Sequence, residues 1–299
     1  MTAHRWRPSL SPAERDVVRA LLTDVERADG VAPVGEQVLR NLDGARAEHL
    51  LVPDEHGVLT GYLNLAPDGT AELAVHPAFR RRGVGASLVT AALERGGDSV
   101  RFWAHGTLPA AKAMAATLHL RAARELIQMR RPLSEIPRAA VPQGVSIKSY
   151  HSISRYHSGA DAELLRVNNA AFSWHPEQGG WTDRDIADRI SAPWFDPAGL
   201  FLAFDDDTGT LCGFHWTKVH DDMLGEVVGE VYVLGVDPGA QGRGLGRTLT
   251  LRGLEYLAER LGAESEVMLY VESDNVAAIT TYESLGFRRC SIDTGYVAG

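Results

Sequence analysis

The sequence has little cysteine, with Cys212 and Cys290 the only two in 299 residues. The two cysteines form no C-x-x-C pair and do not cluster with histidines, which argues against a disulfide framework and against a structural zinc site. The chain also lacks any run near the roughly 18 uninterrupted apolar residues of a membrane span, and its first residues lack the apolar core of a signal peptide. We therefore expect a cytoplasmic protein that binds no metal and no membrane.

Basic residues are in deficit as well, because 30 Lys and Arg stand against 39 Asp and Glu, a formal net charge of −9. An acidic balance argues against general nucleic-acid binding. The hydrophobic fraction of 44% and the charged fraction of 23% are those of an ordinary soluble globular protein. At about 150 residues per domain, the length predicts two domains, each large enough for its own core.

The most informative stretch runs from Glu230 to Arg247. Val231–Val236 has strand character, Asp237-Pro238-Gly239 breaks the strand, and Gln241-x-x-Gly244-x-Gly246 leaves little side-chain bulk at the start of the next helix. The N–H groups at a helix N-terminus are unpaired, and glycine lets a ligand come close to them. Such a site favours the binding of a diphosphate. Taken alone, the pattern is equally compatible with a purely structural turn.

Two familiar phosphate-binding motifs do not fit this stretch. The chain has no Gly-x-x-x-x-Gly-Lys-Ser/Thr, and no strand carries Gly-x-Gly-x-x-Gly with an acidic residue about 20 positions later. The Gln/Arg-x-x-Gly-x-Gly/Ala turn after a strand instead resembles the pyrophosphate loop of the GCN5-related N-acetyltransferases (GNAT). That resemblance implies acetyl-CoA as the bound cofactor.

The same turn occurs a second time in the N-terminal half of the chain. Matching positions lie at one constant offset, 238 − 77 = 161, and they pair Pro77 with Pro238, Arg80 with Gln241, Gly83 with Gly244, Gly85 with Gly246 and Leu88 with Leu249. Self-similarity at domain length indicates two copies of one structural unit. The segment Pro132–Pro142, which contains three prolines, separates the copies, so we predict domains at 1–140 and 141–299.

Hydrophobic periodicity predicts the same order of elements in each copy: strand, two helices, hairpin, strand, helix, strand, helix and strand. A terminal pair of strands is expected after Leu285. This order is that of the acetyltransferase fold, an α+β protein of the α/β sandwich type. We therefore expect two tandem GNAT domains, each a mixed, mostly antiparallel sheet flanked by helices and splayed at its central strand, where the family holds acyl-CoA.

A second family signature lies in the C-terminal half, where Asn275 opens a helix, Tyr282 lies on it, and Gly286-Phe287 ends it. These residues also fit an N-cap, a core aromatic and a C-cap with a buried Phe. We interpret the Gly-Phe pair as structural, and Asn275 and Tyr282 as functional. Aligning Phe102 with Leu269 sets Leu108 opposite Asn275 and Ala115 opposite Tyr282, while the offset of 161 sets Gly69 opposite Glu230.

The two copies therefore differ in the groups that chemistry needs. Aminolysis of a thioester requires a base for the amine proton and an acid for the departing thiolate, whose conjugate pKa of about 8–9 makes tyrosine an adequate donor. The C-terminal copy supplies both, with Glu230 as base and Tyr282 as acid. On a strand without a bulge, Glu230 and Val236 share one face. The N-terminal copy is expected to bind acetyl-CoA without turning it over.

The whole chain resembles those tandem members of the family that acetylate the cysteinyl amine of cysteinyl-glucosaminyl-inositol, and this resemblance implies the binding residues. Acetyl-CoA contacts of the C-terminal copy fall on Leu234, Gly235, Val236, Gln241, Gly242, Arg243, Gly244, Leu245, Gly246, Arg247, Asn275, Val276, Ala277, Ala278, Ile279 and Thr280. Those of the N-terminal copy fall on Leu73, Ala74, Val75, Arg80, Arg81, Arg82, Gly83, Val84 and Gly85. The acceptor-binding residues are Glu36, Glu177, Lys218, Glu230 and Tyr270.

Two other functions stay open at this point. The chain could acetylate another small amine, such as an aminoglycoside or a peptide N-terminus. It could instead be a non-catalytic acyl-CoA sensor that reports cofactor binding to a partner, although an acid and a base in one copy argue against that for the whole chain. The family resemblance implies a monomer whose partners are small-molecule substrates.

Overall fold

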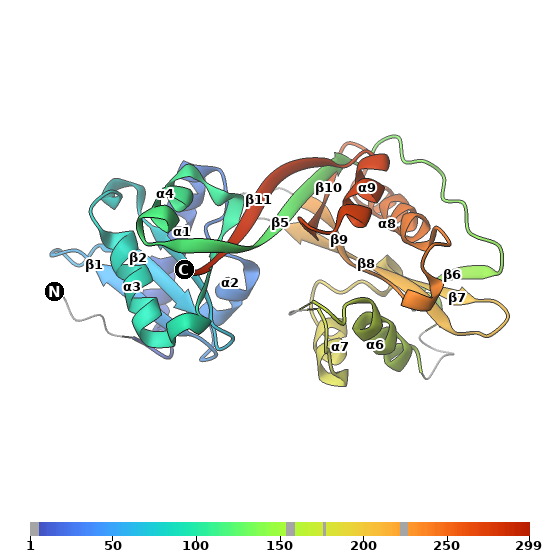
Figure 1. The fold of residues 1–299 in the computed structure, drawn as a ribbon, viewed down its shortest axis with the longest axis horizontal. Helices are drawn as coiled ribbons and strands as arrows, with labels where there is room; N and C mark the ends of the chain where they lie inside the picture. Colours follow the sequence, from blue (N-terminus) through green and yellow to red (C-terminus); the bar gives the residue numbers. More distant parts are fainter. Residues whose placement is uncertain (1–5, 154–158, 176–177, 222–226) are drawn as a thin grey trace. The chain divides into compact units, whose positions relative to one another are not determined.

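The computed structural model describes residues 6–153, 159–175, 178–221 and 227–299. Its contacts divide the chain into two compact units (Figure 1). Unit 1 comprises Met1–Ile127 together with Ser291–Gly299, and unit 2 comprises Gln128–Cys290. The division near residue 140 stays a prediction about where one sequence copy ends, because packing assigns the last nine residues of the chain to unit 1.

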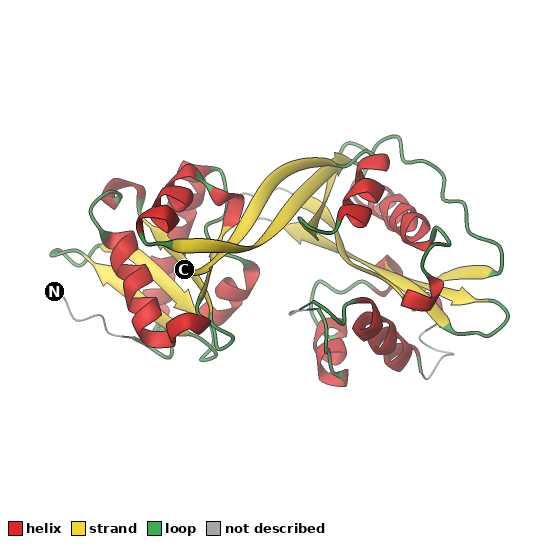
Figure 2. Cartoon of the chain, viewed as in Figure 1, coloured by secondary structure: helices red, strands yellow, loops and turns green. Residues whose placement is uncertain are grey.

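Unit 1 is a sheet with helices on it, in which β1, β2 and β3 pair antiparallel and β3 pairs parallel with β4 (Figure 2). The strand order is β1-β2-β3-β4-β11. The elements are α1 (Pro12–Asp29), α2 (Glu36–Leu42), β1 (Glu48–Pro53), β2 (Leu59–Leu65), β3 (Thr70–Val75), α3 (Val84–Gly96), β4 (Arg101–Ala104), α4 (Pro109–Thr117), the start of β5 (Leu120–Pro132) and the end of β11 (Arg288–Ala298).

Unit 2 repeats this plan with strand order β5-β10-β9-β8-β7-β6. Strands β6 to β9 pair antiparallel, and β9 pairs parallel with β10. The elements are the end of β5, β6 (Val145–Ser149), α5 (Tyr150–Ile153), α6 (Ala160–Ala171), α7 (Asp183–Ile190), β7 (Leu200–Asp205), β8 (Leu211–Asp221), β9 (Val227–Val236), α8 (Leu245–Leu261), β10 (Glu266–Glu272), α9 (Val276–Ser284) and the start of β11.

Local sequence explains why these elements form where they do, as α1 illustrates. The side chain of Ser11 accepts a hydrogen bond from the backbone N–H of Glu14, whose carboxylate accepts one from the backbone N–H of Ser11, a complete capping box. Pro12 occupies the first turn, where its missing N–H has no partner to lose. Gly30 ends the helix at φ 68°, in the left-handed region.

The parallel strand pair at the centre of each unit separates after two residue pairs. In unit 1 the described pairing of β3 with β4 is Thr70 with Arg101 and Ala71 with Phe102. In unit 2, β9 pairs with β10 through Gly229 with Val267 and Glu230 with Met268. Beyond these residue pairs the two strands are no longer paired, so each sheet opens toward their carboxyl ends. The expected fold, with its splayed central strand, is confirmed in both units.

The expected terminal pair of strands is wrong, because residues 288–298 form one strand, β11. Its last part pairs antiparallel with β4 and completes the sheet of unit 1. Asp293 of β11 accepts hydrogen bonds from the ring Nδ1 of His105 at 3.1 Å and from the backbone N–H of Gly106 at 2.7 Å. The other ring nitrogen of His105 donates to Glu72 on β3 at 2.8 Å. One imidazole therefore joins three strands of unit 1.

This cluster gives unit 1 a pH-dependent stability. Burial alone would lower the pKa of His105, but the hydrogen bonds to Asp293 and Glu72 outweigh burial and raise the pKa to about 9. Because the folded pKa lies above the ordinary 6.5, the stabilisation is fully present below pH 6.5 and is lost as pH rises through 9. Its size is on the order of 3 kcal/mol.

We expect Asp293→Asn to shrink that pH dependence by about half, because one of the two carboxylates that hold the imidazolium loses its charge. Urea unfolding at pH 6 and pH 9.5, followed by the amide NMR signals of β4, measures it. Asp98→Asn is the matched control, since Asp98 is exposed in a short helical turn of the same unit. Equal pH dependence in Asp293→Asn and the native chain would contradict the assignment.

Candidate active site

The glycine-rich turn of unit 2 connects β9 to α8. The side chain of Asp237 accepts a hydrogen bond from the backbone N–H of Gly239 at 2.9 Å and so shapes the turn after β9. Gly242 and Gly244 both have φ 78°, and Gly244 is the N-cap of α8 without any side chain bonded to the first N–H groups of the helix. These N–H groups and the positive end of the helix dipole are the chemistry that a diphosphate requires.

A cavity of about 460 Å³ lies next to this turn. It is lined by Ala171, Phe172, Trp174, Leu234, Val236, Gln241, Asp274 and Asn275. The structure thus brings together three parts that the sequence predicted separately: the end of β9, the glycine-rich turn and the start of α9. Tyr282 is not among the residues that line this cavity. Trp174, whose side chain is exposed, lines it although the sequence pattern did not single it out.

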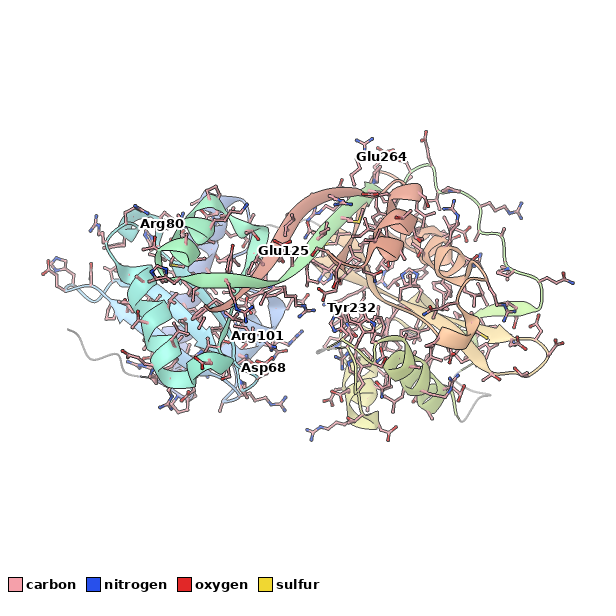
Figure 3. All side chains as sticks on the ribbon, viewed as in Figure 1. Asp68, Arg80, Arg101, Glu125, Tyr232 and Glu264 are labelled. Atoms are coloured by element: carbon pink, nitrogen blue, oxygen red, sulfur yellow. The ribbon has the colours of Figure 1, made fainter. Side chains whose placement is uncertain are left out.

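Unit 1 holds a larger cavity of about 780 Å³ beside its own glycine-rich turn. Its lining includes Leu73, Ala74, Val75, Arg80, Arg81, Gly83, Val84 and Gly85, which is the predicted N-terminal set without Arg82. The guanidinium of Arg82 instead lies over the ring of Phe79, 5.2 Å from its centroid. Asp29 binds the guanidinium of Arg80 through two hydrogen bonds of 2.7 Å, so this arginine is already neutralised within unit 1 (Figure 3).

A bulge in β9 decides which way the predicted base points. Thr217 pairs with Val231 and Trp216 with Val233, so Tyr232 is the extra residue and has no partner on β8. Val236 packs in the apolar cluster on α8, whereas Tyr232 packs with the cluster that contains Trp216. The expectation that Glu230 and Val236 share a face is therefore wrong, because the inserted residue shifts the alternation by one.

Glu230 lies directly opposite Lys218 of β8, and both side chains are buried. The ammonium of Lys218 is 5.0 Å from the ring centroid of Trp194 and 5.5 Å from that of Tyr232. The Oε2 atom of Glu230 is 2.5 Å from the ring Nε2 of His220. A carboxylate, an ammonium and an imidazole thus gather on the face of the sheet that carries Trp216, among aromatic side chains that limit access of water.

The other side of the opening is β10. Val267, Leu269 and Val271 are buried, so the intervening residues occupy the opposite face, the one that Met268 shares with its direct neighbour Glu230. Tyr270 lies on that face, is 40% exposed, and accepts a hydrogen bond from the amide of Gln128 at 2.7 Å. Lys218, Glu230 and Tyr270 of the predicted acceptor set are therefore brought to one face of unit 2.

The two remaining acceptor residues lie outside the described part of unit 2. Glu36 opens α2 of unit 1 and forms an ion pair with Arg40 at 3.1 Å. Glu177 lies outside the described residues. The described part of the chain contains no group of three or more His, Cys, Asp or Glu side chains that could hold a metal ion. Among the described helices, none combines the length and the hydropathy of a membrane span.

Helix α9 presents the predicted acid. The side chain of Asn275 accepts a hydrogen bond from the backbone N–H of Ala278 at 3.2 Å and so caps the helix. Tyr282 lies about two turns later, buried, with its ring edge-on to Phe287 at a centroid distance of 5.7 Å. Burial raises the pKa of Tyr282 to about 12, so the hydroxyl keeps its proton at neutral pH.

Comparison with known proteins fixes the family. The profile of the acetyltransferase (GNAT) family matches residues 17–118 and again residues 166–287. The chain belongs to this family. It is 56% identical over 306 residues to a mycothiol acetyltransferase of Mycobacterium sp. (strain JLS), with 100% of this chain and 99% of that protein covered. A mycothiol acetyltransferase of Mycolicibacterium smegmatis is 55% identical, with 100% of both chains covered.

Solved structures agree on the tandem GNAT fold. A GCN5-related N-acetyltransferase from Sphaerobacter thermophilus superposes with a TM-score of 0.73 at 21% identity, covering 99% of this chain and 95% of that one. A tandem GNAT protein from the clavulanic acid biosynthesis pathway superposes with a TM-score of 0.71 at 20% identity, covering 99% of each chain. At these identities the likeness concerns the fold alone.

The first GNAT copy differs from the second at the positions of Asn275, Tyr282 and Glu230. Leu108 is the N-cap of α4 as Asn275 is of α9, but it makes no side-chain cap. Ala115 occupies the place of Tyr282 on the aligned helix. The strand pairing aligns Glu230 with Thr70 rather than with Gly69, because the bulge at Tyr232 adds one residue to the second copy. Unit 1 thus has a hydroxyl where unit 2 has a carboxylate.

Sequence analysis missed His220, Trp194 and Trp174. One signal for His220 was available: it stands two residues after Lys218 on a strand, so alternation places both on one face. Trp194 lies in an irregular segment between α7 and β7, and Trp174 in one after α6, where no periodicity predicts direction. Their positions next to the sheet follow only from the folded structure.

The GNAT turn offers a matched pair of substitutions. A Cβ at Gly244 meets no atom within 4 Å, yet its φ of 78° strains any other residue, so we expect Gly244→Ala to lower the free energy of unfolding by about 1 kcal/mol. Gly246 lies inside α8 at ordinary φ, and a Cβ there meets only Val236 at 4.0 Å. Gly246→Ala should therefore raise stability by about 0.5 kcal/mol. Urea unfolding measures both, and equal effects would contradict this account.

Proposed function

We propose that the chain transfers acetyl from acetyl-CoA to the cysteinyl amine of cysteinyl-glucosaminyl-inositol, the step that completes mycothiol. The observation that carries the proposal is the buried carboxylate of Glu230 at the point where β9 and β10 separate, on the strand that leads into a glycine-rich turn with the features a diphosphate requires. The mycothiol acetyltransferases that match over the full length, at 55–56% identity, support the choice of acceptor.

Glu230 acts as the general base. The amine nitrogen attacks the thioester carbonyl carbon, the new C–N bond forms, and the carboxylate takes the proton that the nitrogen must lose. Lys218 and Tyr270 share the face of Glu230 and bind polar groups of the acceptor there. The backbone N–H groups near Val236 polarise the carbonyl as negative charge develops on its oxygen. Glu36 and Glu177 complete the acceptor set in this proposal.

Tyr282 acts as the general acid. As the C–S bond breaks, its hydroxyl gives a proton to the departing sulfur. The pKa of about 12 keeps the phenol protonated until that moment. The same burial that raises the pKa of the phenol also destabilises a thiolate next to it, so the transfer becomes favourable only as charge builds on the sulfur. Asn275 supports this arrangement by capping the helix that carries Tyr282.

The cofactor contacts follow the two turns. In unit 2, residues 234–236, 241–247 and 275–280 hold acetyl-CoA for turnover. In unit 1, residues 73–75 and 80–85 hold a second acetyl-CoA that is not turned over, because Thr70 and Ala115 stand where a base and an acid are needed. Backbone N–H groups rather than Arg80 meet the diphosphate there, since Asp29 already neutralises that arginine. A monomeric, cytoplasmic enzyme without a nucleic-acid or membrane partner stays a prediction.

Amine-dependent release of CoA thiol tests the substrate. We expect the highest kcat/KM with cysteinyl-glucosaminyl-inositol, and values lower by roughly 10²-fold or more with an aminoglycoside or a peptide N-terminus, because their polar groups are spaced differently and leave buried polar residues of the face unpaired. A panel of these amines at equal acetyl-CoA gives the ratio. A better aminoglycoside or peptide would replace the acceptor, and no release with any amine would favour an acyl-CoA sensor.

The division of roles at the site has its own test. We expect Tyr282→Phe to lower kcat by roughly 10²-fold with the KM for acetyl-CoA little changed, because only the departing thiolate loses its acid. Tyr256→Phe is the matched control: Tyr256 is also partly buried, its pKa is likewise raised to about 12, and its hydroxyl bonds Asp196 away from the cavity. Near-normal turnover in Tyr282→Phe would remove the proposed acid.

A further inference from the structure

His220 occupies a position from which it can direct the proposed base. It lies near the end of β8, two residues after Lys218, and pairs with Val228 while Lys218 pairs with Glu230. The imidazole therefore reaches Glu230 diagonally across the two strands. The distance from its Nε2 to Oε2 of Glu230 is 2.5 Å, and the side chains of His220 and Glu230 are 18% and 10% exposed.

The contact with His220 involves Oε2 of Glu230, and Oε1 takes no part in it. Among the described residues, no hydrogen bond besides that from His220 reaches the side chain of Glu230. A carboxylate that accepts one charge-assisted or short hydrogen bond loses rotational freedom, and its second oxygen then points in one direction. Proton transfer in a transition state depends on such placement, since a displacement of about 1 Å can lower a rate by roughly 10²-fold.

Other polar side chains on this face have described contacts with partners other than Glu230. The ammonium of Lys218 lies over the rings of Trp194 and Tyr232. On β10, the hydroxyl of Tyr270 accepts from Gln128, and Glu272 forms an ion pair with His175 at 3.3 Å. The described contacts of these residues run to partners other than Glu230, which leaves His220 as the side chain in hydrogen-bond contact with the carboxylate among those described.

We infer that His220 is a positioning residue for Glu230. Its Nε2–H donates to Oε2 and fixes the carboxylate, so that Oε1 takes the proton from the attacking amine. The proton that leaves the nitrogen ends on Glu230, and His220 keeps its own proton throughout. This inference rests on the proposed function, in which Glu230 is the base. It adds a residue that belongs neither to the glycine-rich turn nor to the helix signature.

Two substitutions on the full chain separate donation from mere packing. His220→Gln keeps an N–H near the position of Nε2, whereas His220→Leu keeps the bulk and removes the donor. We expect His220→Leu to lower kcat for acetyl transfer to cysteinyl-glucosaminyl-inositol by roughly 10- to 100-fold. The KM for acetyl-CoA should stay within about twofold, and His220→Gln should recover most of the lost kcat.

A double-mutant cycle with Glu230→Gln decides whether His220 acts through the carboxylate. With the base removed, His220→Leu should lower the remaining rate by less than about threefold, because two residues that act as one unit are not additive. Equal loss in His220→Gln and His220→Leu, or the full loss on the Glu230→Gln background, would overturn the inference and assign His220 to support of the sheet.

The contact can be measured without turnover. In the native chain labelled with ¹⁵N at histidine, the ring proton of His220 should appear at low field and move upfield in Glu230→Gln, where a neutral amide replaces the charged acceptor. If the native chain acetylates no amine, the proposed function fails, and this signal alone decides the inference. A ring proton that does not respond to Glu230→Gln overturns it.

Discussion

The separation of a parallel strand pair after two residue pairs is the constraint on which the rest of the structure depends. Adjacent parallel strands normally exchange hydrogen bonds along their whole length, which leaves no room between them. In each unit here the pairing stops early, and the carboxyl ends diverge. The cavity of each unit lies beside the strand that leads into its glycine-rich turn, and the helix after that turn directs unpaired N–H groups outward.

A single inserted residue then differentiates the two copies. Tyr232 bulges from β9, so Glu230 lies on the face that carries Trp216, whereas Val236, six positions later, lies on the side of α8. Glu230 consequently faces His220 and Lys218, and the end of the same strand faces α8. The first copy has no such insertion in the described pairing of β3 with β2. Glu230 and Val236 thus lie on opposite faces of one strand, whereas a regular strand would put two residues six positions apart on the same face.

Much of this architecture is readable in the sequence, because it arises from local rules. The repeat at an offset of 161, the turn glycines, the capping box of α1 and the Asn275 cap each depend on residues a few positions apart. The bulge, by contrast, depends on how β8 and β9 register, and nothing near Tyr232 in the sequence requires it. The contact of His105 with Asp293 spans 188 residues, and that of His220 with Glu230 depends on which strands become neighbours. Such contacts follow from topology rather than from propensity.

The assignment of residues 291–299 to unit 1 has a consequence for how the protein is made. A ribosome produces α1 to α4 and β1 to β4 long before it reaches β11. During that time β11 cannot cover the edge of β4 with which it pairs in the folded protein. The sheet of the first unit is therefore closed by a segment that is translated after the whole of unit 2. An open strand edge is a template for pairing with another chain, so the nascent protein carries its greatest risk of misassembly in the half that was translated first.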